Sequence, residues 1–564
     1  MSRNFEGSGP SWQAIPYTPP DPLPQSVDAQ SVIALAYVST LSLLVPYGVH
    51  RLWMIRHHRW GGESQLKPHR KSSAQDVRGS GVTVQLPLYN ERTVAQRLLR
   101  SVELLVAPPG GLEIQILDDS TDETRELVER EVARLLEKGI DAKLIRRSQR
   151  LGFKAGALDG GLRQAKYDLL CVFDADFVPR PDFLLRSLPH FADPGIGMLQ
   201  SRWGHINRDE SNLTRAQATL LDGHFVIEHK VRHDEGLFFN FNGTAGIWRR
   251  QAIEDGGGWQ HDTLTEDLDL SYRAQLAGWR FRYDHRLIAP AELPGTMNAF
   301  KSQQNRWARG SMQVLRKLGP RLLRADIGWR KRAEALAHLT SYIGAPGVLL
   351  IGALLPLLVT RELQVPGWVH LGAFVISTLS IFSFYSRSQK SVGRARGARW
   401  RDTLLAVALG TGMCVSQTKA ILQGMFGKTG TFTRTPKSGD ASSDQHYRAK
   451  LRGWAGEELL LSLWLGWGIL TALLEGQWGA LPFLCLYFGG FTWVGAMSLK
   501  EALSVLRSAP GQATFEGDPD GQHSDQSTNA GHEPLLGEKV TADLDNHGAD
   551  RDAEHDDRWQ RVGQ

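Results

Sequence analysis

The sequence predicts an α/β domain with a mostly parallel sheet, joined to an α-helical bundle of about five membrane spans. Two features of the hydropathy pattern predict this class. Between residues 80 and 320, short apolar strand patterns alternate with helical patterns, which is typical of a parallel sheet covered by helices. On both sides lie nearly uncharged segments that approach the ~20 residues needed to cross a hydrocarbon core of ~30 Å. Because the chain has 564 residues, more than one structural unit is expected.

The apolar segments divide into one span before the α/β region and four spans after it. Residues 31–54 form the first predicted span and leave residues 1–30 as an extracytoplasmic segment. Residues 337–385 contain the second and third spans, and residues 458–499 contain the fourth and fifth. A signal peptide is the alternative for the first segment, but no basic region or small-residue cleavage site brackets it. Buried core helices are the alternative for the others, and their number and length favour membrane spans.

Basic residues predict the orientation of these spans. Lys and Arg follow the first and third spans, whereas the connections near Arg361 and Gln477 are short and nearly neutral. The positive-inside rule therefore places the α/β domain in the cytosol. The chain is then an integral protein of a cytoplasmic or Golgi-type membrane. Because these basic loops account for the net charge of +5, no nucleic-acid partner is predicted.

Three further segments complete the organisation. Residues 402–425 are helical and fairly apolar but carry polar side chains, and their basic flanks predict an amphipathic helix on the cytosolic membrane surface, with a true span as the alternative. Residues 426–456 form a basic loop. Residues 509–564 form an acidic tail whose composition cannot bury a core, which predicts disorder.

Within the α/β region, strands and helices are expected in alternation. The predicted strands are Val82–Leu88, Glu113–Leu117, Ala142–Ile145 and Asp168–Phe173. The predicted helices are Thr93–Leu105, Glu123–Lys138 and Lys154–Lys166. Ligands bind at the carboxyl ends of the strands in such sheets, so polar motifs at these ends are candidate site residues.

Asp118 and Asp119 form the first of these motifs, directly after a predicted strand. Their carboxylates are suited to hydrogen bonding a base or a ribose. The alternative is a turn in which Asp and Ser side chains cap the next helix. The motif by itself leaves both interpretations open.

Asp174 and Asp176 follow the fourth predicted strand. Side chains two residues apart on a strand share one face, so both carboxylates can address one cation. A hard divalent ion, Mg²⁺ or Mn²⁺, is held by one or two carboxylates together with substrate phosphates, which suits a nucleotide-diphosphate leaving group. A solvated strand end is the alternative, and the position at a strand terminus favours the metal site.

Thr265, Glu266 and Asp267 open a predicted helix over Leu268–Ala277. The structural interpretation is strong, because Thr is a good N-cap and acidic residues suit the positive end of the helix dipole. The functional interpretation uses the same physics. The dipole and the free amides favour ionised Asp267, which can then accept a proton from a hydroxyl.

Gln303, Arg306 and Trp307 have the spacing of residues that share one helix face. On that face the Trp can stack on a sugar, the Gln can bond its hydroxyls and the Arg can neutralise a phosphate. An interfacial helix with a snorkelling Arg and an anchoring Trp is the alternative. Lys154 stands at a predicted helix start, where anions bind, although an exposed first-turn lysine is the more ordinary interpretation.

Taken in order, these motifs resemble those of the processive family 2 glycosyltransferases, such as cellulose synthase, hyaluronan synthase and the plant cellulose synthase-like enzymes. The resemblance covers roughly residues 80–500 and looks closest to the plant mannan and xyloglucan-backbone branch. The matching motifs are Gln85–Glu91, Leu117–Asp122, Lys154–Leu158, Phe173–Phe177, Phe241–Gly246, Thr265–Asp267 and Gln303–Trp307. The resemblance implies a GT-A fold, the nucleotide-diphospho-sugar transferase fold, for the cytosolic domain.

The resemblance also implies roles at the matching positions. Asp267 would be the general base, with Glu266 beside it in the catalytic motif. The nucleotide and its phosphates would be bound by Asp118, Asp119, Lys154 and Asp174, and the metal by Asp174 and Asp176. The acceptor and pyrophosphate would be bound by Gln303, Arg306, Trp307, Phe241, Asn242 and Gly243. In the basic loop, Phe432–Lys437 resembles a gating loop that closes over the nucleotide through Thr435 and Lys437.

The function implied is that of a membrane-embedded, inverting hexosyltransferase. It would transfer glucose or mannose from UDP-glucose or GDP-mannose to a growing β-glycan acceptor, with β-1,4 linkage, and extrude the polymer past the membrane lipid. A lipid β-glycosyltransferase is the main alternative, and a nucleotide-sensing channel or transporter is a weaker one. The sugar and any envelope partner for export are not specified by these motifs.

Overall fold

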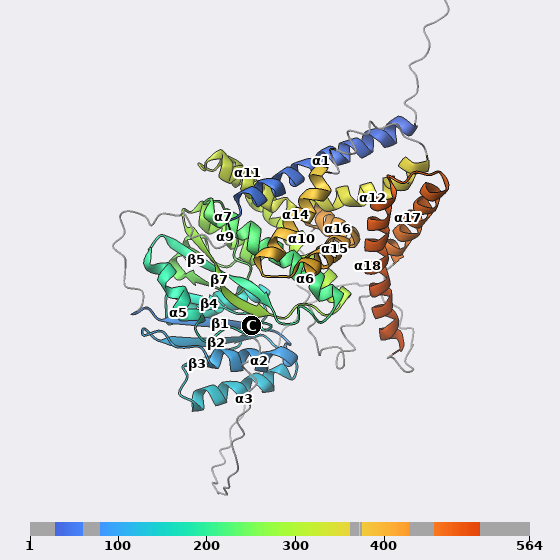
Figure 1. Ribbon diagram of the computed structural model, residues 1–564. Helices are drawn as coiled ribbons and strands as arrows, with labels where there is room; N and C mark the ends of the chain where they lie inside the picture. Colours follow the sequence, from blue (N-terminus) through green and yellow to red (C-terminus); the bar gives the residue numbers. More distant parts are fainter. Residues whose placement is uncertain (1–28, 60–78, 361–371, 373–374, 428–455, 508–564) are drawn as a thin grey trace, which may run out of the picture. The chain divides into compact units, whose positions relative to one another are not determined.

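The computed structural model describes residues 29–59, 79–360, 372, 375–427 and 456–507 (Figure 1). The predicted N-terminal segment and acidic tail lie almost wholly outside the described residues. So does nearly all of the basic loop, including Thr435 and Lys437.

The α/β domain is built on one seven-stranded sheet. Its strands are β1 (Val82–Leu88), β2 (Leu112–Asp118), β3 (Ala142–Ile145), β4 (Leu169–Val172), β5 (Ile196–His205), β6 (Gly246–Arg249) and β7 (Arg280–Ala291). They lie in the order β3-β2-β1-β4-β6-β5-β7, and β6 alone runs antiparallel to its neighbours. The mostly parallel sheet is therefore confirmed. β1 and β3 have the predicted bounds, whereas β4 ends one residue earlier than expected.

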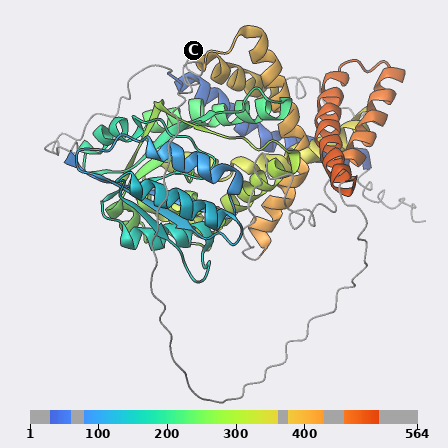
Figure 2. The same cartoon turned by 90° about the horizontal axis from the view of Figure 1, so that it is seen from below.

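Helices cover both faces of this sheet. They are α2 (Arg92–Glu103), α3 (Thr124–Glu137), α4 (Phe153–Gln164), α5 (Phe183–Ser187), α6 (Asn212–Asp222), α7 (Lys230–Asp234), α8 (Arg250–Asp255) and α9 (Glu266–Leu276), with short segments η2 (Leu188–Ala192) and η3 (Gly223–His229). One core joins β1 and β2 to α2 and α3, which lie together on one face (Figures 1 and 2). A second core joins the sheet to α4, α8 and α9. Burial on both faces explains why β4 is a continuous apolar run, whereas β1 and β2 carry buried polar side chains such as Gln85 and Gln115.

The remaining elements are mostly apolar helices. They are α1 (Ala29–His57), α10 (Met297–Arg324), α11 (Trp329–Leu339), η4 (Ser341–Ile343), α12 (Gly344–Thr360), η5 (Val375–Leu379), α14 (Ser380–Ser391), α15 (Arg396–Gly412), α16 (Cys414–Phe426), α17 (Gly456–Leu474) and α18 (Leu481–Arg507). α17 and α18 lie side by side (Figures 1 and 2). α10 packs against both α9 and α16, so it connects the α/β domain to the apolar helices.

Within the described part of the chain, four helices have the length and hydropathy of membrane spans. They cover Gln30–His57, Ser341–Thr360, Gly456–Leu474 and Leu481–Ser504. These helices overlap the first, second, fourth and fifth predicted spans and fit membrane integration. The third predicted span falls partly on residues 361–371, outside the described residues, and its described part contains η5 and the start of α14.

Residues 402–425 differ from the single helix that was expected. α15 and α16 form a bent pair with an angle of 50°, and the pair together is apolar enough for one further span. α15 packs against α6 and α18, while α16 packs against α10 and α12. The bend lets one apolar segment contact both the α/β domain and the apolar helices. Its place at the membrane surface stays a prediction.

Candidate active site

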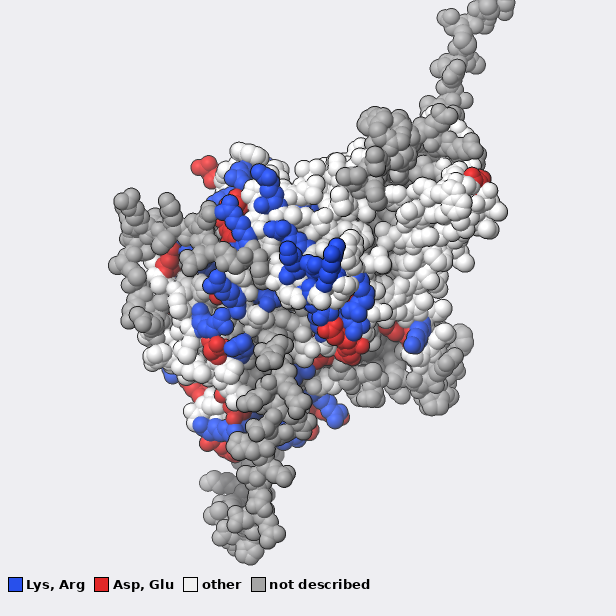
Figure 3. All heavy atoms as spheres, in the orientation of Figure 1, with Lys and Arg blue, Asp and Glu red and all other residues white. Residues whose placement is uncertain are grey.

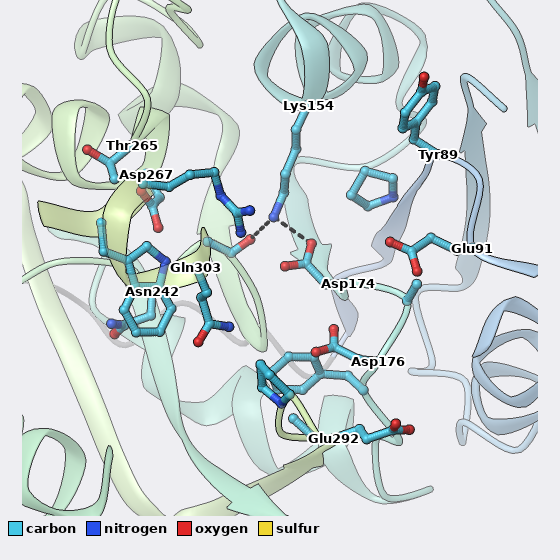
Figure 4. Close-up of a pocket in the computed structure, with 18 of the residues that line it drawn as sticks. Tyr89, Glu91, Lys154, Asp174, Asp176, Asn242, Thr265, Asp267, Glu292 and Gln303 are labelled. Carbon is cyan, nitrogen blue, oxygen red and sulfur yellow. Dashed lines mark hydrogen bonds and ion pairs between the residues drawn. The ribbon is translucent and has the colours of Figure 1, made fainter. Parts of the chain in front are cut away.

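A polar pocket of ≈ 210 Å³ opens at the carboxyl ends of β1, β2 and β4. Among the residues that line it are Asp119, Lys154, Asp174, Asp176, Asn242, Gly243, Glu266, Asp267, Gln303, Arg306 and Trp307. In the view of Figure 4, Asp267, Asn242 and Gln303 lie on one side, Tyr89 and Glu91 on the other, and Lys154 with Asp174 between them. The structure thus gathers most of the candidate residues into one site.

Lys154 occupies the centre of the pocket. Its Nζ donates to Asp174 Oδ1 at 2.5 Å and to the carbonyl oxygen of Gly243 at 2.9 Å. Burial by itself lowers the pKa of Lys154, but the carboxylates of Asp174 and Glu266 outweigh it and raise the pKa. The lysine is therefore a fixed positive charge inside the pocket, and not an exposed first-turn side chain.

Asp174 and Asp176 lie in a turn beyond the end of β4 and not on the strand itself. Strand alternation predicted that the two carboxylates share one face. It does not explain why both reach the pocket, because neither residue is on the strand. The turn is held instead by the Asp174 amide, which donates to Thr244 Oγ1 at 2.8 Å. Both carboxylates line the pocket.

These two carboxylates fit a divalent cation that is shared with a substrate. Among the described residues, no group of three or more His, Cys, Asp or Glu side chains forms a metal site by itself. A hard cation bound by one or two carboxylates plus phosphate oxygens needs no such group. The donor set therefore suits Mg²⁺ or Mn²⁺ completed by a diphosphate.

Asp118 and Asp119 point to different surroundings. Asp118 is buried at the end of β2, where Arg146 donates to it at 2.8 Å, and it is not among the residues that line the pocket. Asp119 lines the pocket and accepts a hydrogen bond from Arg147 Nε at 3.0 Å. The pair therefore offers one carboxylate to the pocket.

The first turn of α9 places Glu266 and Asp267 in the pocket. Thr265 stands at the N-cap position but makes no capping hydrogen bond, so the capping interpretation is not supported for its side chain. Burial, then the charge of Glu266, raises the pKa of Asp267 to about 7, despite the nearby Lys154 and the Leu268 amide. These effects outweigh the helix end, which was expected to favour the ionised form. A carboxyl with such a pKa is well suited to general base catalysis near neutral pH.

Gly243 packs directly against the Asp267 carboxylate. Its φ is +82°, and a Cβ at this position would lie 2.9 Å from Asp267 Oδ2. We expect Gly243→Ala to displace the carboxylate and lower kcat by about 10²-fold, because small misplacements of catalytic groups have effects of that size. Gly278→Ala is the matched control, because its φ is +100° and no atom lies within 4 Å of its Cβ position. Equal kcat values for the two variants would contradict this prediction.

The face of α10 that was predicted from helical spacing is present. Gln303, Arg306 and Trp307 all line the pocket, and the Trp307 ring lies 6.5 Å from that of Trp203. Asn242 and Gly243 also line it, whereas Phe241 is fully buried in the second core, edge-to-face against Trp248.

Several pocket residues were given no role from the sequence, although Tyr89 lies in the motif Gln85–Glu91. They include Tyr89, Arg150, Trp203, His205 and Glu292. The Arg150 guanidinium lies 3.3 Å from the centroid of the Tyr89 ring. Tyr89 follows the end of β1, so the rule that identified the other strand ends applies to it as well. The other four residues come from loops and strands that are distant along the chain. No local sequence pattern indicates that these segments meet at the pocket.

A larger cavity of ≈ 1140 Å³ continues from the pocket between the apolar helices. The two share Trp203, Leu221, Asn242, Thr265, Asp267, Gln303 and Trp307. Its further lining comes largely from α1, α12, α14, α15 and α18, and it mixes apolar side chains with Tyr, Ser, Thr and Gln.

Comparisons with known proteins show the family. Residues 80–310 match the family described as glycosyltransferase like family 2. Glucomannan 4-beta-mannosyltransferase 2 of Arabidopsis thaliana is 37% identical over 380 residues, which cover 64% of this chain and 68% of that protein. Glucomannan 4-beta-mannosyltransferase 9 of the same plant is 34% identical over 374 residues, covering 60% and 69%.

Among solved structures, a mannosyltransferase from Pyrobaculum calidifontis in complex with GDP-Man and Mn²⁺ aligns with a TM-score of 0.47 and 18% identity, over 70% of this chain and 99% of that one. The family match and the two plant relatives establish the family without it. The chain therefore belongs to glycosyltransferase family 2, and it is a nucleotide-sugar-dependent glycosyltransferase of the cellulose synthase-like group.

Proposed function

We propose that this chain adds mannose from GDP-mannose to a growing β-1,4-glycan and passes the polymer into the cavity between its apolar helices. The observation that carries this proposal is that Asp267, Gln303 and Trp307 line both the polar pocket and the larger cavity. A chain extended at Asp267 thus has a continuous space ahead of it. The sugar is inferred from the two plant relatives, whose names specify 4-beta-mannosyl transfer, and GDP-mannose is the mannose donor that the motif resemblance left open.

The proposed chemistry is a direct displacement with inversion. Asp267 accepts the proton of an acceptor hydroxyl as that oxygen attacks the anomeric carbon of the donor sugar. Lys154 stabilises the negative charge that grows on the diphosphate as the bond to the sugar breaks. A divalent cation bound at Asp174 and Asp176 would supply further positive charge to the same group. Gln303 and Trp307 hold the acceptor on the side of the pocket next to Asp267.

The lining of the cavity supports a carbohydrate occupant. Tyr37, Tyr342 and Tyr487 supply aromatic rings, and Gln417 and Gln477 supply amides. Aromatic faces and hydrogen-bonding groups fit a neutral polyhydroxyl chain.

The proposed orientation places the α/β domain in the cytosol. Lys and Arg side chains gather over α14 and α15 (Figure 3). Arg387, Lys390, Arg396 and Arg401 are exposed in this part of the chain. Basic residues close to the ends of spans favour the cytosolic side.

Labelled donors supplied to membranes that contain the chain test the proposal. With Mg²⁺ or Mn²⁺, we expect label from GDP-mannose to enter ethanol-insoluble polymer that a β-mannanase digests, and label from UDP-glucose to enter it at least tenfold less. Membranes with the Asp267→Asn variant are the blank. Polymer made only from UDP-glucose and digested by a cellulase would reject mannose as the sugar. Label found only in the organic-soluble fraction would reject polymer synthesis in favour of a lipid glycosyltransferase.

A further inference from the structure

Asn242 stands at the junction of the pocket and the cavity, and it lines both. Its backbone amide donates to Gln200 Oε1 at 2.9 Å, which fixes the main chain. Its side-chain Nδ2 lies 3.0 Å from His224 Nε2 on η3. Figure 4 shows Asn242 close to Gln303, on the side of the pocket that carries Asp267. The direction of this amide therefore affects the groups that an acceptor sugar meets.

The tautomer of His224 is set by Glu228, one helical turn further along η3. His224 Nδ1 lies 3.0 Å from Glu228 Oε2. Burial by itself raises the pKa of Glu228, but Arg232 and His224 outweigh it and hold the pKa well below its usual range. The carboxylate is thus an acceptor, and His224 Nδ1 carries the hydrogen. In a neutral imidazole the other nitrogen, Nε2, is then an acceptor and can take only the NH₂ end of the Asn242 amide.

The orientation of the Asn242 amide also determines the surroundings of its carbonyl oxygen. With the NH₂ group bound to His224, the Asn242 carbonyl oxygen Oδ1 is buried, and no donor lies within hydrogen-bond range of it among the residues that the structure describes. A buried acceptor without a partner is unfavourable by about 1–3 kcal/mol. A hydroxyl group of a bound sugar would supply the missing donor.

We propose that His224 and Glu228 are positioning residues that hold the Asn242 amide with its carbonyl available to a hydroxyl of the acceptor sugar. The inference rests on the proposed function, because it takes the acceptor to be a β-linked glycan. In this role His224 and Glu228 of η3 contribute to acceptor recognition but do not contact the reacting atoms. The donor side of the pocket is not involved, because Lys154 and Asp174 have other contacts.

Two substitutions at His224 distinguish loss of the hydrogen bond to Asn242 from loss of the imidazole ring. The side-chain end of Gln reaches about as far as Nε2, so His224→Gln keeps an acceptor for the Asn242 amide. Asn is shorter and reaches only about as far as Nδ1, so His224→Asn does not. With β-1,4-mannotetraose as the acceptor probe and labelled GDP-mannose as the donor, we expect His224→Asn to raise the acceptor KM by about five- to tenfold. We expect the donor KM of both variants, and the acceptor KM of His224→Gln, to stay within about twofold of wild type.

A double-mutant cycle with Asn242→Ala tests whether His224 acts through Asn242. His224→Asn should have no further effect on the acceptor KM in the Asn242→Ala background. Glu228→Gln tests the same role if a His224 variant does not fold. An uncharged amide no longer selects the Nδ1–H tautomer of His224. This variant should therefore raise the acceptor KM in the same way as His224→Asn.

The results distinguish failure of the positioning role from failure of the proposed function. If the wild-type protein transfers mannose to the oligosaccharide but His224→Asn and His224→Gln give equal acceptor KM values, the positioning role is wrong and the proposed function stands. Full additivity in the cycle would lead to the same conclusion. If the wild-type protein transfers no sugar to any β-linked oligosaccharide or polymer, the proposed function and the positioning role are both wrong.

Discussion

Asp267→Asn should lower the rate of glycosyl transfer by about 10²- to 10⁴-fold and leave the fold intact. An amide cannot accept the acceptor proton at neutral pH, so the variant loses the base. It still offers an oxygen to the Leu268 amide, which donates to Asp267 Oδ1 at 2.8 Å, so the first turn of α9 keeps its hydrogen bond. Steady-state transfer by purified protein measures the loss, and thermal unfolding in detergent checks the fold.

A matched control lies a few residues earlier, in the loop that precedes α9. Asp262 is more than half exposed and pairs with Lys317 at 2.7 Å. Asp262→Asn should therefore keep the wild-type rate within about twofold, since exposed ion pairs contribute little. Loss of transfer in Asp262→Asn equal to that in Asp267→Asn would show that charge near α9, and not the base itself, determines the rate.

The pH dependence provides a second test of the same residue. Burial and the charge of Glu266 raise the pKa of Asp267 to about 7. Transfer needs the deprotonated carboxylate, so the rate should be fully developed above this pKa and fall as pH drops through it, approaching tenfold per pH unit. The residual activity of Asp267→Asn should lack this acidic decline. A wild-type rate that stays constant from about pH 8 to pH 5 would contradict the assignment.

The second large effect is expected at a buried ion pair that connects α10 to α17. Lys301 Nζ lies 2.8 Å from Glu458 Oε1, and each side chain is only 1% exposed. Removal of one partner takes the close counter-charge away from the other, which destabilises a buried ion pair by about 3–5 kcal/mol. We therefore expect Lys301→Met and Glu458→Leu each to lower the free energy of unfolding by about this amount. Denaturant titration in detergent micelles measures it.

The double variant Lys301→Met with Glu458→Leu is the control. Replacement of a whole buried pair by apolar residues is often neutral, so most of the lost stability should return. Simple addition of the two single effects would show that the residues act independently. Because Lys301 is on the same helix as Gln303 and Arg306, the single variants should also weaken acceptor binding, and the double variant should restore it.

Much of the candidate site was predictable because its residues follow local rules. Asp174 and Asp267 stand at element ends, where parallel sheets and helix N-termini expose their polar groups. Gln303, Arg306 and Trp307 share a face because helical periodicity depends on sequence spacing alone. The strand and helix order of the domain follows in the same way from alternating apolar patterns.

Other parts of the site depend on segments that are distant along the chain. Asp118 is adjacent in sequence to Asp119, yet it is paired with Arg146, because β3 brings that arginine to the end of β2. Phe241 belongs to the same motif as Asn242, yet it is part of the core, because Trp248 lies against it. No pattern within these motifs distinguishes a lining side chain from a buried one.

The sequence by itself determined the family, the α/β class and the apolar helices, since these depend on local composition, periodicity and motif order. Only the tertiary structure decided the joining of the pocket to the larger cavity, the pairing of Lys301 with Glu458, and the orientation of Asn242 by His224. Each of these requires atoms from distant segments to meet within a few ångströms. Hydrogen bonds and buried ion pairs act only at that range, and the packing of the folded chain sets it.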